Sequence, residues 1–102
     1  MEIHQLNLLF IISRSRTNKQ GLAPINCRLT YKEQRKQFAT GLFIKPVHWQ
    51  NSKQRAHPPN EENNFINTQL SLIKNHINQA FFISYTTKKP IVSYRFLLFS
   101  QF

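Results

Sequence analysis

The side chains best suited to molecular recognition lie in two short segments, residues 25–31 and 35–40, where polar residues occupy alternate positions. Arginine can form paired hydrogen bonds with the edge of guanine, and asparagine or glutamine can do the same with adenine. The residues expected to share one face are Asn26, Arg28, Thr30, Arg35 and Gln37. This pattern predicts contacts with nucleic-acid bases, and a solvated polar face without a ligand is the alternative.

A second group of basic residues flanks these segments. Between Arg14 and Arg55 there are ten basic residues and one acid, Glu33, a net charge of +9 out of +10 for the whole chain. So much charge of one sign favours a polyanionic partner, with nucleic acid as the first candidate. Phosphate contacts are predicted, with general solubility as the alternative, for Arg14, Arg16, Lys19, Lys32, Lys36 and Lys45.

Residues that could support catalysis or hold a metal are scarce. The chain has no aspartate and only two glycines, which excludes a glycine-rich phosphate loop. A zinc site is not expected, because Cys27 has no partner cysteine and the histidines lack ligand spacing: His4, His48, His57 and His76. The sequence therefore predicts no enzyme activity, no metal, no cofactor and no small-molecule substrate.

The length and composition are typical of one small domain. The 102 residues allow one modest core, and 40% hydrophobic content argues against a disordered basic tail. The single cysteine suits a reducing compartment. No signal peptide and no apolar stretch of membrane-spanning length is recognised, so a cytoplasmic protein without membrane contact is expected.

Three strands are predicted to position the recognition residues. They cover residues 6–13, 25–31 (with Pro24 opening the strand) and 35–40, and short turns should join them as an antiparallel meander. One face is expected to be apolar and the other polar and basic. The core side should hold Ile25, Cys27, Leu29 and Phe38. On the first strand, Phe10 and Ile12 should share one face, and Leu9 and Ile11 the other.

A long helix is predicted to complete the fold. Residues 42–49 connect to a polar loop at 50–59, and Asn60 then provides an N-cap. Trp49 is expected in the core between helix and sheet, with stacking on a base as the alternative. A helical stripe follows at Ile66, Leu70, Ile73, Ile77 and Phe81. The fold class is α+β: a three-stranded antiparallel β-sheet packed against one long helix that runs to about residue 84. The domain should cover residues 1–89 and an apolar tail residues 90–102.

With these elements placed, residues 6–80 resemble the N-terminal arm DNA-binding domain of tyrosine recombinases, the phage-type integrases of Bacteroidetes and their mobile elements. The resemblance rests on a basic loop ending in glycine (residues 14–21), an Ala-Pro-Ile strand start (23–25), a basic strand ending in Phe-Ala-Thr-Gly-Leu (35–42), and the step from Pro46 to Trp49. The order and spacing of these segments match the family pattern.

This resemblance implies binding of arm-type DNA sites away from the crossover, through the face of a three-stranded sheet in the major groove. Double-stranded DNA is then the partner, and other recombinase subunits are further candidates. The residues after Lys89 depart from the family pattern. The catalytic set of a recombinase does not occur in the chain, so a truncated or separately encoded arm domain is expected.

Two other functions stay open from the residues alone. One is RNA binding, although a sheet that reads RNA usually presents stacking aromatic side chains on its exposed face. The outward positions of the second and third strands carry none, which favours DNA. The other is a protein-interaction or assembly module that uses the apolar tail.

Overall fold

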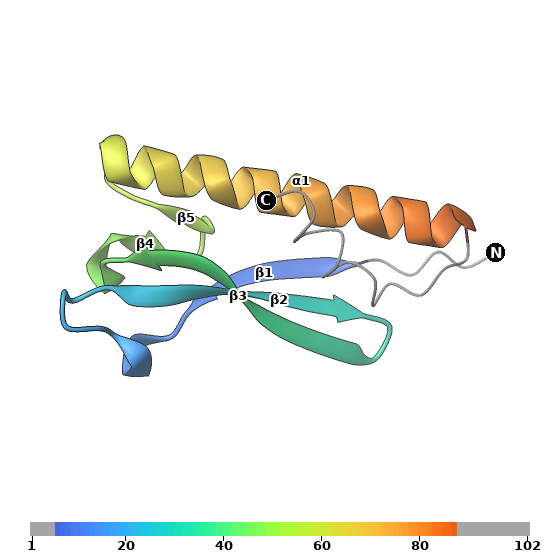
Figure 1. Ribbon diagram of the computed structural model, residues 1–102, viewed down its shortest axis with the longest axis horizontal. Coiled ribbons are helices and arrows are strands. Elements are labelled where there is room, and N and C mark those ends of the chain that lie inside the picture. The colour runs from blue at the N-terminus through green and yellow to red at the C-terminus, as the bar shows by residue number, and fades with distance from the viewer. Residues whose placement is uncertain (1–5, 88–102) are drawn as a thin grey trace. The chain divides into compact units, whose positions relative to one another are not determined.

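The computed structural model describes the backbone of residues 6–87 and the side chains of residues 6–81 (Figure 1). A three-stranded antiparallel sheet, a two-stranded ladder and one long helix follow each other along the chain, which confirms the predicted α+β class. The predicted tail, residues 90–102, and its boundary after residue 89 lie outside the described residues. The elements are β1 (Asn7–Ile12), η1 (Arg14–Arg16), β2 (Ala23–Tyr31), β3 (Gln34–Ile44), η2 (Pro46–His48), β4 (Trp49–Gln50), β5 (Arg55–Ala56) and α1 (Glu61–Thr87).

The chain divides into two compact units, residues 1–68 and 69–102. The first unit contains both sheets and the start of α1. All the predicted recognition residues therefore belong to one unit.

The central strand β2 pairs with β1 on one side and β3 on the other. The register places Cys27 opposite Phe10 of β1 and opposite Phe38 of β3, so these three side chains share one face. Along β2, Ala23, Ile25, Cys27 and Leu29 are buried, whereas the residues between them are partly exposed. This confirms the predicted inner face of the sheet.

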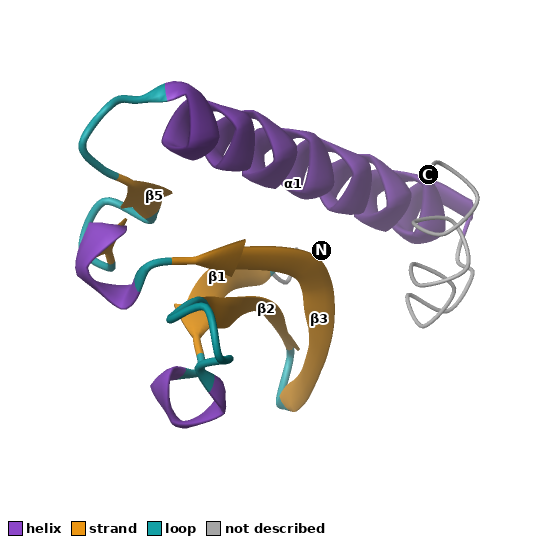
Figure 2. Cartoon of the chain, turned by 60° about the vertical axis from the view of Figure 1, so that its left-hand side comes forward, coloured by secondary structure: helices purple, strands orange, loops and turns teal. Residues whose placement is uncertain are grey.

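A bulge bends β3 near its middle. Asn26 pairs with Ala39, but Pro24 pairs with Phe43, so β3 has extra residues between these two pairs. The Thr40 hydroxyl donates to the Ile25 carbonyl at 2.7 Å and accepts from the Leu42 N–H at 3.1 Å, while Gly41 takes a φ of +84°. The strand curves strongly along its length (Figure 2).

This bulge corrects the predicted end of the third strand. The strand was expected to end at Thr40, but it continues to Ile44. The Thr40 hydroxyl supplies hydrogen bonds at the irregular position, and glycine adopts the left-handed conformation without steric cost, so pairing resumes beyond it. Ile44 is consequently buried opposite Ala23 instead of lying in a connection.

The predicted polar loop at 50–59 is more ordered than expected. β4 and β5 form a two-stranded ladder in which Trp49 pairs with Ala56. The loop is tied to β1 by Gln54, which accepts a hydrogen bond from the Phe10 N–H at 2.6 Å and donates to the Phe10 carbonyl at 3.0 Å. A side-chain amide thus replaces a strand neighbour at the edge of the sheet.

Two asparagines tie the same loop to the start of α1. Asn67 exchanges two hydrogen bonds with the backbone of Ala56, at 2.7 and 3.1 Å. Asn63 is buried and donates to the Pro58 carbonyl at 2.8 Å. Its own N–H is bonded to the Asn60 side chain at 2.7 Å, which confirms Asn60 as the N-cap.

The helical stripe is buried at most of its predicted positions. Ile66 is buried in the first unit, and Leu70, Ile73 and Ile77 are buried in the second. At the end of the stripe Ala80 is buried, whereas Phe81 is only partly buried. Trp49 is also a core residue, as predicted, with 8% of its surface exposed.

We expect Thr40→Val to lower the free energy of unfolding by about 1–3 kcal/mol, because it leaves the Leu42 N–H and the Ile25 carbonyl without their partner. Urea unfolding would measure the change. Thr30→Val is a matched control on the neighbouring strand, since Thr30 makes no hydrogen bond through its side chain among the described residues. An equal loss in both variants would contradict a special role for Thr40.

Burial raises the pKa of the Cys27 thiol from 9.0 to about 12. The unfolded thiol therefore loses its proton at a lower pH than the folded thiol. The contribution of this pKa difference to the free energy of unfolding is fully present below about pH 9 and is lost as the pH rises towards 12. Between these values the free energy of unfolding should fall more steeply in the wild type than in Cys27→Ala, by up to about 1.4 kcal/mol per pH unit. Urea titrations at a series of pH values would test this, and equal slopes would contradict it.

Candidate nucleic-acid interface

The predicted recognition residues lie on one face of the sheet, opposite the buried one. This outer face is built from cross-strand pairs: Arg28 lies directly opposite Gln37, and Thr30 lies opposite Arg35. Asn26 pairs with Ala39 on the same face. Opposed residues of an antiparallel pair have Cβ atoms about 4.5–5.5 Å apart, so these side chains form one continuous polar surface.

The arginines of this surface are not engaged inside the described part of the chain. Arg28 and Arg35 make no side-chain hydrogen bond or ion pair with another residue of 6–81, and neither does Gln37. Arg35 and Gln37 are exposed, and Arg28 is partly exposed. Asn26 differs, because its amide donates to the Ser13 hydroxyl at 3.0 Å. Ser13, which sequence reasoning did not single out, thereby orients Asn26.

The edge strand β1 adds residues to this face that sequence reasoning did not count as part of the site. The register pairs Leu9 with Arg28, Ile11 with Asn26, and Asn7 with Thr30. Leu9 and Ile11 are partly exposed. Their alternation with Phe10 was visible in the sequence, but only the register shows which polar residues they adjoin.

The basic loop after β1 is closed by its own hydrogen bonds. Asn18 accepts from the backbone N–H groups of Gln20 and Leu22, each at 3.0 Å, and Gly21 takes a φ of +80°. Arg14, Arg16 and Lys19 are exposed on this loop. The Ser13 N–H donates to the Pro24 carbonyl at 3.0 Å, so the loop begins at the Pro24 end of β2.

Another basic group lies at the opposite end of β2. Lys32 occupies the turn between β2 and β3 with a φ of 56°, and its ammonium lies 5.5 Å from the centre of the Tyr31 ring. Lys36 is exposed but lies opposite Leu29, so its side chain starts from the inner face. Tyr31 lies seven positions after Pro24, a length of about 23 Å in a strand, so positive charge is distributed along the length of the sheet.

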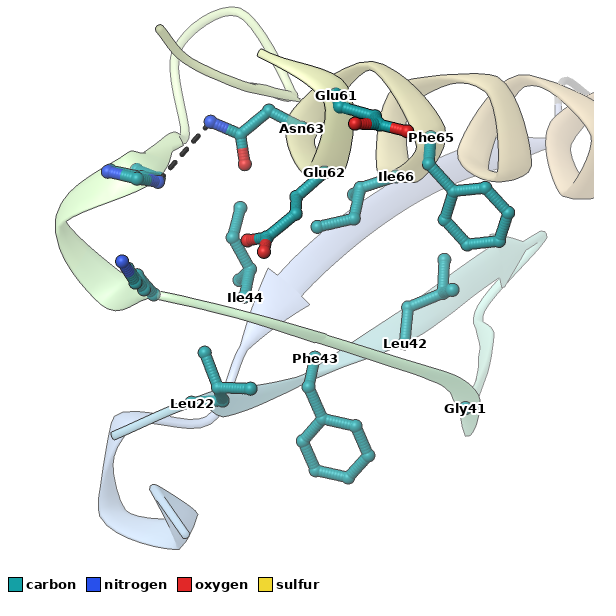
Figure 3. Close-up of a pocket in the computed structure, with 12 residues that line it drawn as sticks. Leu22, Gly41, Leu42, Phe43, Ile44, Glu61, Glu62, Asn63, Phe65 and Ile66 are labelled. Atoms are coloured by element: carbon teal, nitrogen blue, oxygen red, sulfur yellow. Dashed lines mark hydrogen bonds between the residues drawn. The ribbon is translucent and has the colours of Figure 1, made fainter. Parts of the chain in front are cut away.

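Lys45 is separate from these groups. It lines a groove between the end of β3 and the start of α1, together with Glu61 and Glu62. Figure 3 shows Leu42 and Ile66 on the helix side of β3, whereas Phe43 points away from the helix. Two carboxylates therefore accompany Lys45, which makes it the least favourable of the predicted phosphate contacts.

Metal and membrane features are not found in the described part of the chain. Residues 6–81 hold no group of three or more histidine, cysteine, aspartate or glutamate side chains that could bind a metal ion. No described helix is both long and apolar enough to cross a membrane.

Residues 10–96 match the family model of the arm DNA-binding domain. The match covers most of the chain, and the chain therefore belongs to this family, which confirms the resemblance to the N-terminal arm domain of integrases. Neither a curated protein nor a solved structure matches the chain. The class defined by the fold and the family is thus a DNA-binding module of integrase-type proteins.

Proposed function

We propose that this chain binds duplex DNA sequence-specifically, at arm-type sites of a tyrosine recombinase, through the outer face of its sheet. The observation that carries the proposal is the cross-strand cluster of Arg28, Gln37 and Arg35 on one face, in a chain that belongs to the arm DNA-binding domain family. These side chains have the donor geometry that distinguishes guanine and adenine in the major groove.

The dimensions of the sheet support insertion into that groove. Neighbouring strands are about 4.8 Å apart, and the major groove of B-DNA is about 12 Å wide and admits a two-stranded ribbon. The β2–β3 hairpin would enter deepest, and β1 would lie towards one wall of the groove. Arg28 and Gln37 would then approach base edges from adjacent strands.

The basic residues at the two ends of the sheet would contact phosphates. Arg14, Arg16 and Lys19 on the loop before β2 and Lys32 in the β2–β3 turn are exposed at opposite ends of the sheet. Lys36 is exposed on β3 near that turn, and its side chain starts from the inner face. Such contacts orient a protein on DNA without reading its sequence. We assign Asn26 and Thr30 to the base-reading group, and we rank Lys45 last because of its neighbouring carboxylates.

Duplex DNA is favoured over RNA by the composition of the outer face. Between the β2–β3 turn and the bulge, the outward side chains of the three strands include no aromatic residue; Phe43 lies beyond the bulge. Sequence-specific RNA binding by a sheet commonly relies on aromatic stacking at such positions. The proposed role is binding without catalysis inside the cell, with strand cleavage carried out by recombinase catalytic domains.

We expect affinity for duplex DNA to depend strongly on salt. If about three to six phosphates are neutralised, the slope of log K against log salt should be about −3 to −5. Fluorescence anisotropy with a labelled duplex at several salt concentrations would measure it. Replacing Arg14, Arg16 and Lys19 together by glutamine should make the slope shallower by about 2–3. A salt-independent affinity would contradict the proposal.

We expect Arg28→Ala and Arg35→Ala to relax base preference, each by about 1–3 kcal/mol at the base that it contacts. Lys19→Ala should weaken binding to all sequences alike. Selection of sites from a random duplex library, repeated with each variant, would measure the preference.

Arg28→Lys is the matched control for this experiment. It keeps the positive charge but removes the planar pair of donors, so general affinity should persist while the preference at that base is lost. If Lys19→Ala changed the base preference and the two arginine variants did not, the residues that read bases would lie on the loop and not on the sheet face.

A further inference from the structure

The outer face of the sheet combines two kinds of surface. The strands β2 and β3 contribute polar and basic side chains, whereas β1 contributes the apolar strip Leu9 and Ile11. Both residues of this strip are partly exposed. On the opposite, inner face of β1, Phe10 lies in the core with 4% of its surface exposed.

The strip adjoins the residues proposed to read bases. Leu9 lies directly opposite Arg28, and Ile11 lies opposite Asn26. A partner that meets Arg28 and Asn26 at base edges would therefore meet the strip as well. Apolar side chains gain free energy only from an apolar partner, and the apolar group in the major groove is the 5-methyl of thymine.

The spacing along β1 suits such contacts. Leu9 and Ile11 are two residues apart on one face, which corresponds to about 6.8 Å in an antiparallel strand. Two base-pair steps of B-DNA also span about 6.8 Å along the helix axis, at 3.4 Å per step. If β1 crosses the bases close to the direction of the helix axis, each side chain meets its own base pair, with one pair between them.

We infer that Leu9 and Ile11 contact the methyl groups of thymines two base pairs apart, next to the bases contacted by Arg28 and Asn26. This inference rests on the proposed function and extends it, because it makes the edge strand a determinant of sequence preference. The recognised site would then combine bases read by hydrogen bonds with neighbouring thymines read by apolar contact.

The test uses duplexes in which deoxyuridine, which lacks only the 5-methyl, replaces thymine at single positions of the site selected from a random library. The wild type should lose about fourfold in affinity for each contacted methyl group. Leu9→Ala should bind more weakly, and it should no longer distinguish thymine from uracil at one position. Ile11→Ser, whose side chain carries no methyl group, should lose the same distinction two base pairs away.

Leu8→Ala is the matched control, because Leu8 lies opposite Leu29 on the inner face and should leave the distinction intact. Thermal melting of each variant would confirm folding, and the wild-type comparison of thymine with uracil requires no variant. Equal wild-type binding to thymine and uracil duplexes would overturn the inference while leaving the proposed function standing. A library that yields no enriched sequence would overturn the proposed function of sequence-specific binding and the inference with it.

Discussion

The pairing of β2 with both of its neighbours is the constraint on which the site depends. Every second residue of β2 from Ala23 to Leu29 is buried, so the register of β1 and β3 against it assigns each of their side chains to the inner or outer face. A slip by one residue would expose Cys27 and bury Arg28 without a partner. Hydrophobic burial on one face therefore fixes which side chains form the polar outer face.

The sheet needs additional devices because β1 is an edge strand and β3 is long. Gln54 satisfies the Phe10 backbone at the open edge, and the Thr40 hydroxyl completes hydrogen bonding at the bulge. Asn67 and Asn63 connect Ala56 and Pro58, which follow Gln54 in the segment 50–59, to the start of α1. Side-chain amides and one hydroxyl, instead of further strands, thus hold the unit together around a small core.

The basic groups and the central polar side chains occupy different parts of the sheet. Exposed arginines and lysines cluster on the loop after β1 and at the β2–β3 turn, at opposite ends of β2. Between them lie Arg28, Gln37 and the apolar side chains of β1. This arrangement is compatible with the proposed function, in which the ends contact phosphates and the middle reads bases, and the chain belongs to the arm DNA-binding domain family.

The alternation of residue types by itself determined the three strands and the inner face at Ile25, Cys27 and Leu29, because these features depend on local periodicity. The N-cap at Asn60 likewise followed from a local capping signal. These local patterns did not reveal the continuation of β3 to Ile44 or the contact of Gln54 with Phe10. Those depend on residues brought together across 15 and 44 positions of the chain, by the Thr40–Ile25 and Gln54–Phe10 hydrogen bonds. The neighbours of Leu9 on the outer face were likewise decided by strand register, a property of two strands together that neither segment carries alone.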